Sequence, residues 1–401
     1  MEIFVARQPI LNEHKRLFAY ELLYRGTDDG RLASGEKMTA SLLSATFLTE
    51  GLDVISGSKP CFVNFTKDLL LRGIPSSFPS RKVVVEILED IPPTAEILKV
   101  CHALRAEGYT IALDDFVYDK SLESMVALAD IIKIDFRISS EDEIRRTLRR
   151  LAHYPVKFLA EKVESYEEFE FATKLGFKYF QGYFFARPEV FRVHELESFK
   201  ASLIALLAEV TKKSTTAERL EQIISKDAAL SYKLLKYINS SYFYRISAIE
   251  SVRHAIVFLG EKEIKRFILL VIISEIATDK PSELIKLAIV RARFCELLAE
   301  SCDYRRMSAE IFLLGLLSLL DAMLDVEMGK VIDQLPLGNV LKNALSSRTG
   351  PMAPFLDAVI AFEQHDREAC ISALDELGVD KSLVQKMYID SLAFGDALSS
   401  F

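Results

Sequence analysis

The first half of this sequence alternates between two kinds of segment, and this alternation limits the fold more than any other feature. Short runs rich in β-branched and aromatic residues recur up to about residue 190, and segments with helical spacing of apolar residues separate them. We predict strands at 2–10, 16–24, 61–65, 81–88, 110–116, 131–136, 156–163 and 178–186. Such alternation favours a parallel sheet, and this many units favours a closed α/β barrel.

Helical segments are predicted between the strands and throughout the second half. In the first half they lie at 37–52, 93–108, 141–154 and 166–177, and Gly108 and Gly176 stand where glycines often end helices. From about residue 195 the strand pattern stops, and long helices are predicted at 196–213, 216–239, 249–277 and 282–302. We therefore predict a barrel domain at 1–194, a helical connector at 195–213 and an all-helical domain at 214–401.

Composition excludes several classes of protein. A net charge of -8 over 401 residues argues against broad nucleic-acid binding, which needs many Lys or Arg side chains against phosphates. The five cysteines form no C-x-x-C pair and no zinc-ligand spacing. No signal peptide is recognised at the N-terminus. We therefore expect the protein to lie in a reducing cytoplasm. The longest apolar runs, from Phe267 and from Ile311, are too short to span a bilayer and are predicted as buried helices.

Polar residues fall repeatedly at the carboxyl ends of the predicted strands, where a parallel barrel builds its ligand site. They are Glu21, Asn64, Glu86, Asp114, Asp115, Lys133, Glu161 and Gln181. Each alone has an ordinary interpretation: a solvated acid, an ion pair of Lys133 with Asp135, or a turn residue before Gly182. Together, several acids at one barrel mouth would repel one another, and a divalent cation relieves that repulsion. Oxygen donors select Mg²⁺ or Mn²⁺, and adjacent aspartates suit a two-metal site for phosphoester hydrolysis.

The order of these residues resembles the EAL domain, the cyclic di-GMP phosphodiesterase module of bacteria. The motif E-A-L-x-R appears as "ELLYR", Glu21 to Arg25, and Q-P-I precedes it at Gln8. The other matching motifs are "FVNFT", "EILE", "DDF", "KID", "AEKVE" and "QGYFFARP". The resemblance covers nearly all of residues 1–190 and implies a TIM-like barrel.

The resemblance also implies a role for each matching residue. The ligands of one Mg²⁺ or Mn²⁺ ion would be Glu21, Asn64, Glu86 and Asp114. Asp114 would bridge to a second ion, whose other ligands would be Asp115 and Glu161. Lys133 and Glu161 would be the catalytic residues, with Lys133 orienting or helping to deprotonate the attacking water. Gln8, Arg25 and Gln181 would contact or support the ligand, and Glu89 would anchor the loop after the aspartates.

Two positions depart from the family pattern. The family usually continues D-D-F-G-T-G-Y-S-S-L, whereas here Val117, Asp119 and Lys120 lie in a shorter loop that lacks both glycines. Those glycines allow positive φ and a close backbone approach. Lys162 replaces the glycine of A-E-G-V-E. Both departures put efficient hydrolysis in doubt and leave the metal ligands in place. Because EAL relatives often pair through this loop, a homodimer is possible.

The second half resembles the HDOD domain, a helical relative of the HD phosphohydrolases, over 225–243 and 249–270. Active relatives carry a metal-binding His-Asp dyad in G-L-L-H-D, and the comparable "GLLSLL" has Ser318 and Leu319 there. A literal His-Asp pair at His365 and Asp366 lies too far along the chain, and His254 is expected to be an ordinary helix residue. The helical half is therefore expected to bind an unknown signalling partner. EAL followed by HDOD is a known bacterial signalling architecture, the YuxH type.

Three functions remain open from the sequence. The first is a receptor that binds cyclic di-GMP with a divalent metal, hydrolyses it weakly or not at all, and signals through the helical domain. The second is an active phosphodiesterase that gives the linear dinucleotide pGpG. The third is a scaffold that acts only by protein contact, and buried acids retained without a metal would be a standing cost to it.

Overall fold

The computed structural model describes residues 3–26, 55–187, 198–212, 215–226, 228–238, 249 and 251–398. The chain divides into two compact units, Met1–Phe185 and Ala186–Phe401. The helix predicted at 37–52 lies outside the described residues, as does part of the predicted connector. The domain boundaries at residues 194 and 213 stay predictions.

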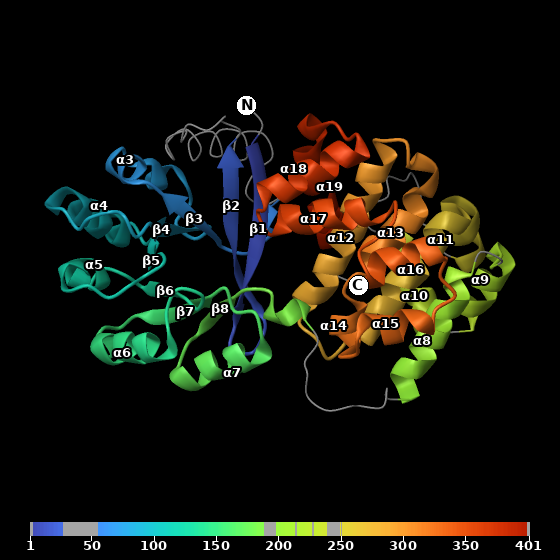
Figure 1. Ribbon diagram of the computed structural model, residues 1–401, viewed down its shortest axis with the longest axis horizontal. Coiled ribbons are helices and arrows are strands. Elements are labelled where there is room, and N and C mark those ends of the chain that lie inside the picture. The colour runs from blue at the N-terminus through green and yellow to red at the C-terminus, as the bar shows by residue number, and fades with distance from the viewer. Residues whose placement is uncertain are drawn as a thin grey trace. The chain divides into compact units, whose positions relative to one another are not determined.

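The first unit contains a closed barrel of eight strands in chain order. The strands are β1 (Ile3–Asn12), β2 (Leu17–Gly26), β3 (Cys61–Phe65), β4 (Val83–Ile87), β5 (Thr110–Leu113), β6 (Ile131–Asp135), β7 (Lys157–Glu161) and β8 (Tyr179–Gln181). Figure 1 shows helices on the outside of these strands. They are α3 (Lys67–Leu71), α4 (Ala95–Ala106), α5 (Glu123–Val126), α6 (Glu141–Leu151) and α7 (Tyr166–Leu175). The predicted α/β barrel is confirmed.

The direction of β1 differs from a purely parallel barrel. This strand pairs antiparallel with β2 on one side and with β8 on the other, while the remaining neighbours are parallel. The reason is the short polar connection between β1 and β2, because a tight turn can join only antiparallel strands. Asn12 closes this turn, and its side-chain oxygen accepts hydrogen bonds from the backbone N–H groups of His14 and Arg16.

Side-chain caps and glycines set the ends of the barrel helices. The Thr94 hydroxyl caps α4, Ser140 and Glu143 form a reciprocal capping box on α6, and Ser165 caps α7. Gly176 ends α7 with φ of 93°, as the sequence predicts. These caps define where each helix begins or ends, and therefore how the chain leaves and re-enters the strands that carry the polar residues.

A layer of buried apolar side chains fills the barrel interior, with one member from every strand. The members are Ile10, Ala19, Phe62, Val84, Ala112, Ile131, Leu159 and Tyr179. Phe18 packs beside this layer and stacks on Tyr179 with ring centroids 4.0 Å apart. Because the layer closes the barrel below the carboxyl ends of the strands, the space above it is the part open to a ligand.

The described residues of the second unit are helical, with no strand among them. The helices are α8 (Ser198–Thr211), α9 (Ala217–Ser225), α10 (Ala228–Ile238), α11 (Val252–Ile276), α12 (Ser282–Glu300), α13 (Ser308–Leu317), α14 (Leu320–Leu324), α15 (Met328–Asp333), α16 (Asn339–Ser346), α17 (Ala353–Glu363), α18 (Arg367–Leu377) and α19 (Lys381–Leu398). The predicted helical half is confirmed. Among the described helices, none is both long and apolar enough to cross a membrane.

Two glycines shape the packing of these helices. Gly260 has φ of 75° and kinks α11, which the sequence pattern predicts as one continuous helix. Gly315 lets α13 lie against α12, because a Cβ at this position would come within 2.6 Å of the Ala292 Cα. The apolar run from Ile311 is buried in α13, as predicted.

Candidate functional site

Each strand of the barrel places one polar side chain just above the apolar layer. Side chains two positions apart on a strand point to the same face, and every polar residue lies two positions from a member of that layer. The polar residues are Gln8, Glu21, Asn64, Glu86, Asp114, Lys133, Glu161 and Gln181. On β1 the step runs backward, from Ile10 to Gln8, because that strand is antiparallel. The polar residues are thus a second interior layer, at the end of the barrel where the parallel strands β3 to β8 have their carboxyl ends.

Lys133 stands at the centre of this polar layer. Its side chain is completely buried, and its Nζ contacts four carboxylates that come from four other strands. The distances are 2.7 Å to Glu161 Oε1, 2.8 Å to Asp114 Oδ1 and 3.3 Å to Glu21 Oε2. The fourth partner is Glu86, which is also completely buried. One ammonium group therefore holds together acids that would otherwise repel one another.

Side-chain amides complete the layer. Gln181 Nε2 donates to Glu21 Oε2 and to Gln8 Oε1, at 2.7 Å in both cases. Asn64 Nδ2 donates to Glu21 Oε1 at 3.4 Å. These bonds fix the carboxylate of Glu21 from both sides, and they connect β2 with β3, with β8 and, through Gln8, with β1.

Burial and mutual repulsion keep protons on part of this acid group. Burial, followed by the charge of Glu21, raises the pKa of Glu86 well above its ordinary value. Burial raises the pKa of Glu161 to about 8, against the opposing effect of Lys133. Burial alone would lower the pKa of Lys133, but the four carboxylates outweigh it and the pKa lies well above the usual lysine value. Lys133 is therefore a fixed positive charge in the absence of another cation.

The layer offers unused oxygen atoms to a cation. Glu86 Oε2, Glu161 Oε2 and Gln181 Oε1 are buried and have no hydrogen-bond partner among the described residues. Buried polar atoms without partners are rare in folded proteins, since each carries a desolvation cost. A donor set of carboxylate and amide oxygens is the type that Mg²⁺, Mn²⁺ and Ca²⁺ prefer. The residues present therefore fit a divalent cation.

The remaining predicted residues lie at the rim of the same end. Asp115 follows Asp114 with φ of 39°, and carboxylate oxygens of Glu89, Asp114 and Asp115 lie within 4.8 Å of one another. Glu89 is exposed, whereas both aspartates are half-buried. Arg25 lies on β2 opposite Phe4 of β1, and its side chain is outside the described residues. In the loop after Asp115, the Val117 side chain is 64% exposed.

The structure also shows an ion pair that the sequence does not suggest. Asp135, the last residue of β6, pairs with Lys162, which follows directly after β7. The alternative of a simple pair between Lys133 and Asp135 is therefore not what the described contacts show. The only sequence signal for the observed pair is a lysine at the glycine position of the A-E-G-V-E motif.

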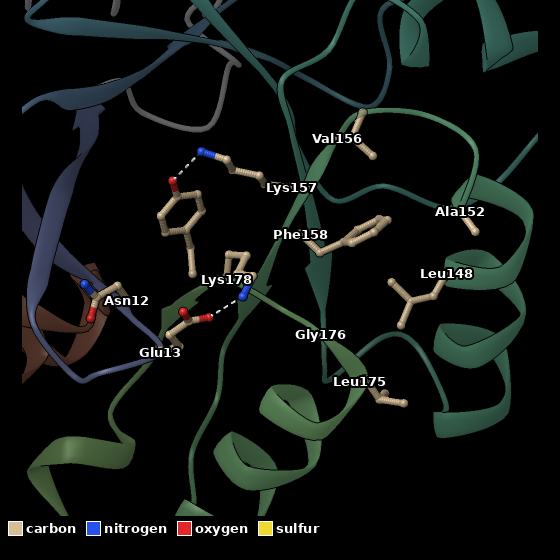
Figure 2. A pocket seen from close by; sticks show the side chains of 11 residues that line it. Asn12, Glu13, Leu148, Ala152, Val156, Lys157, Phe158, Leu175, Gly176 and Lys178 are labelled. Carbon is tan, nitrogen blue, oxygen red and sulfur yellow. Dashed lines mark hydrogen bonds and ion pairs between the residues drawn. The ribbon is translucent and has the colours of Figure 1, made fainter.

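A cavity of about 530 Å³ lies at the opposite end of the barrel, around the first residues of β7 and β8. Figure 2 shows its lining, with an ion pair between Lys178 and Glu13. The Lys157 ammonium donates a hydrogen bond to the Tyr179 hydroxyl at 3.4 Å. None of the polar residues of the interior layer lines it. Because this cavity lacks the converging acids, we do not regard it as the functional site.

In the helical unit, the position expected to replace the His-Asp dyad has a different polar arrangement. Ser318 follows α13, and its hydroxyl accepts a hydrogen bond from Arg291 Nη1 at 3.3 Å. Arg291 is buried on α12 and forms a bidentate pair with Glu363 of α17, from 2.7 to 3.0 Å. Sequence reasoning missed this pair, for which two charged residues on otherwise apolar helices are the only signal.

The literal His-Asp pair has a structural role. The Asp366 side chain caps α18 by accepting from the Ala369 N–H at 3.1 Å, and His365 takes positive φ just before it. His254 is exposed in the first turn of α11, where its N–H donates to the capping Ser251 hydroxyl. Both observations agree with the ordinary structural interpretation of these histidines.

Comparison with known proteins matches two domain models to the chain and finds relatives along nearly its whole length. The EAL domain model matches residues 57–188, and the HDOD domain model matches residues 196–325. The chain is 36% identical to the uncharacterized protein YuxH of Bacillus subtilis (strain 168) over 404 residues, covering 98% of each chain. It is 35% identical to the cyclic di-GMP phosphodiesterase CdgJ of Vibrio cholerae over 393 residues, covering 97% of this chain and 91% of CdgJ.

Among solved structures, the chain is similar to BlrP1 of Klebsiella pneumoniae in its complex with calcium and cyclic di-GMP. The match is 23% identical with a TM-score of 0.38, and it covers 47% of this chain and 56% of BlrP1.

Proposed function

Because the chain belongs to the EAL–HDOD family, the YuxH type, we propose that its barrel is a metal-dependent receptor for cyclic di-GMP. One observation carries this proposal. Four carboxylates from different strands converge on Lys133, and two of them keep a buried oxygen without a partner among the described residues. An arrangement with this desolvation cost is best explained by a cation that completes it.

Each polar residue has a proposed role in this receptor. The oxygen atoms that would hold Mg²⁺ or Mn²⁺ are those of Glu21, Asn64, Glu86, Asp114, Asp115 and Glu161. Such a cation, when bound, polarises phosphate oxygens and lowers the pKa of bound water. Lys133, held between Glu161 and Asp114, would orient a water or a phosphate oxygen. Gln8, Arg25 and Gln181 would contact or support the nucleotide, and Glu89 would hold the loop after Asp115.

Hydrolysis by this barrel is proposed to be slow or absent. The loop after Asp115 lacks the two glycines of the family pattern, and Val117 stands exposed in place of the first. A loop without these glycines cannot approach the ligand in the same backbone conformation. The bound state would then be transmitted through the helical unit, where Arg291 holds Ser318 at the dyad position. An unknown signalling partner, a possible homodimer and a cytoplasmic location belong to this proposal.

A second candidate is an active phosphodiesterase that gives pGpG. The observation that favours it is the similarity to CdgJ over nearly the whole chain, since CdgJ is named as a cyclic di-GMP phosphodiesterase. The two candidates share the same site and differ in the rate of one chemical step.

One experiment separates them. Purified full-length protein is titrated with cyclic di-GMP in a calorimeter, with Mn²⁺ or with EDTA, and the same mixtures are analysed by chromatography for pGpG. The receptor predicts binding that needs Mn²⁺ and is lost in Asp114→Asn, with little or no product. A matched control is Glu170→Gln, which neutralises an exposed acid on α7 and should bind as the unchanged chain does. Rapid product formation would favour the phosphodiesterase, and absence of binding would refute both candidates.

A further inference from the structure

Lys162 adopts a backbone conformation that is unusual for a lysine. Its φ is 54°, in the left-handed region that glycine adopts freely and most other residues avoid. Backbone hydrogen bonds of the two neighbouring residues fix this conformation. The carbonyl of Glu161 accepts from the Phe136 N–H at 3.2 Å, and the Val163 N–H donates to the Gln181 carbonyl at 3.0 Å. The side chain of residue 162 therefore starts from a defined point at the carboxyl end of β7.

The ammonium of Lys162 is held at that end of the barrel by a buried acid. Its Nζ pairs with Asp135, whose carboxylate is 2% exposed and also accepts from the Arg137 N–H at 2.5 Å. Asp135 lies opposite Glu161 in the register of β6 and β7. Because Asp135 itself cannot move freely, it restrains a side chain that is otherwise 55% exposed.

The same ammonium lies near a carboxylate that would serve a second divalent ion. Lys162 directly follows Glu161 in the chain. The Asp135 residue that pairs with Lys162 lies opposite Glu161 in the register of β6 and β7. In the two-metal arrangement that the family resemblance implies, Asp115 and Glu161 are the ligands that belong to the second ion. A positive charge held next to Glu161 by Asp135 would compete with that ion.

We propose that Lys162 takes the electrostatic place of the second divalent cation, so that this barrel binds one divalent ion tightly instead of two. This inference rests on the proposed function, because it concerns the same carboxylates. It also gives a physical reason for slow hydrolysis, since two-metal phosphoester hydrolysis stabilises both the attacking and the leaving oxygen, and one ion cannot do both.

The test counts ions and needs no measurement of activity. Full-length protein is titrated with Mn²⁺, and the bound ions are counted by calorimetry and by electron paramagnetic resonance, which detects magnetic coupling between two neighbouring Mn²⁺ ions. We expect one tight ion and no coupling in the unchanged chain. Lys162→Gly, which relieves the positive φ, should bind a second ion at least roughly tenfold more tightly and show the coupling.

Two further variants separate charge from backbone strain. Lys162→Met removes the charge and keeps a side chain of similar length, and Lys162→Arg keeps the charge. The number of tight ions should be two for Lys162→Met and one for Lys162→Arg. Lys174→Met, on an exposed lysine of α7, is the control and should keep one. Should Lys162→Gly fail to fold, the Met and Arg variants still decide the question.

The outcomes distinguish this inference from the proposed function. Two tight ions in the unchanged chain would overturn the role of Lys162 and leave the metal-dependent receptor intact. One tight ion in both Lys162→Gly and Lys162→Met would overturn it equally. No tight ion in any variant would refute the proposed function, and this inference with it.

Discussion

Lys133→Met should destabilise the metal-free barrel strongly and in a pH-dependent way. The lysine is completely buried and is the shared partner of four carboxylates. Removing one partner of a buried ion pair costs about 3–5 kcal/mol, because the other charge stays behind without compensation. Methionine has a similar length and fills most of the volume, so the loss reports charge more than packing.

Protonation of the remaining acids limits that loss at low pH. The pKa of Glu161 is raised from 4.5 to about 8 in the folded state. The stability contributed by its neutral form is therefore fully present below pH 4.5 and is lost as the pH rises to about 8. Without the Lys133 ammonium, this pKa would rise further. The destabilisation should therefore be about 3 kcal/mol at pH 6 and larger by about 1–2 kcal/mol at pH 9, since one pKa unit corresponds to about 1.4 kcal/mol.

The assay is urea unfolding in EDTA at both pH values, followed by far-ultraviolet circular dichroism. Because the chain has two compact units, hydrogen exchange read by mass spectrometry on barrel peptides assigns the lost stability to the first unit. Lys174→Met, at a lysine whose side chain is 75% exposed, is the control and should cost less than about 1 kcal/mol. If Lys133→Met were as stable as this control at pH 6 and pH 9, the central role of the ammonium would be wrong.

Three other perturbations test different parts of the structure. Glu363→Gln should lower the free energy of unfolding of the helical unit by about 3–5 kcal/mol in a urea titration, because its arginine partner is buried. The control Asp357→Asn, at an exposed ion pair, should lower it by less than about 1 kcal/mol. Gly182→Ala should prevent normal folding, because the new Cβ would lie 2.1 Å from the Val163 carbonyl oxygen. The control Gly329→Ala, whose Cβ would have no atom within 4 Å, should not lower the melting temperature. Mn²⁺ should raise the melting temperature of the barrel more at pH 8.5 than at pH 6. The Glu161 carboxyl must lose its proton before it can bind the ion, and its pKa is about 8. An equal rise in melting temperature at both pH values would contradict this.

The strands and the converging polar residues could be predicted because both depend on local patterns. The strand at Cys61–Phe65 appears where the sequence predicts it, and its alternation places Phe62 and Asn64 on the same face. A residue two positions before Glu86 or Lys133 is likewise apolar and part of the interior layer. The period of two thus carries information about the site as well as about the fold.

Contacts between distant segments could not be predicted in the same way. The central position of Lys133 depends on the lengths and directions of four side chains from separate strands. The pair of Lys162 with Asp135 depends on the register of two strands. The pair of Arg291 with Glu363 joins residues that are 72 positions apart in the sequence. No local pattern records such partners. The antiparallel direction of β1, in contrast, follows from a short connection that the sequence does show.

The seam between β1 and β8 has a consequence for synthesis of the chain. Glu21 is held by the amide of Gln181, 160 residues further along, and the barrel closes only when Asn12 and Tyr179 meet. During translation at about 5–20 residues per second, roughly 10–30 s would pass between the emergence of the first hairpin and that of its last neighbour. The edge of β1 that pairs with β8 would stay unpaired during that interval, whereas β2 can pair with β3 much earlier.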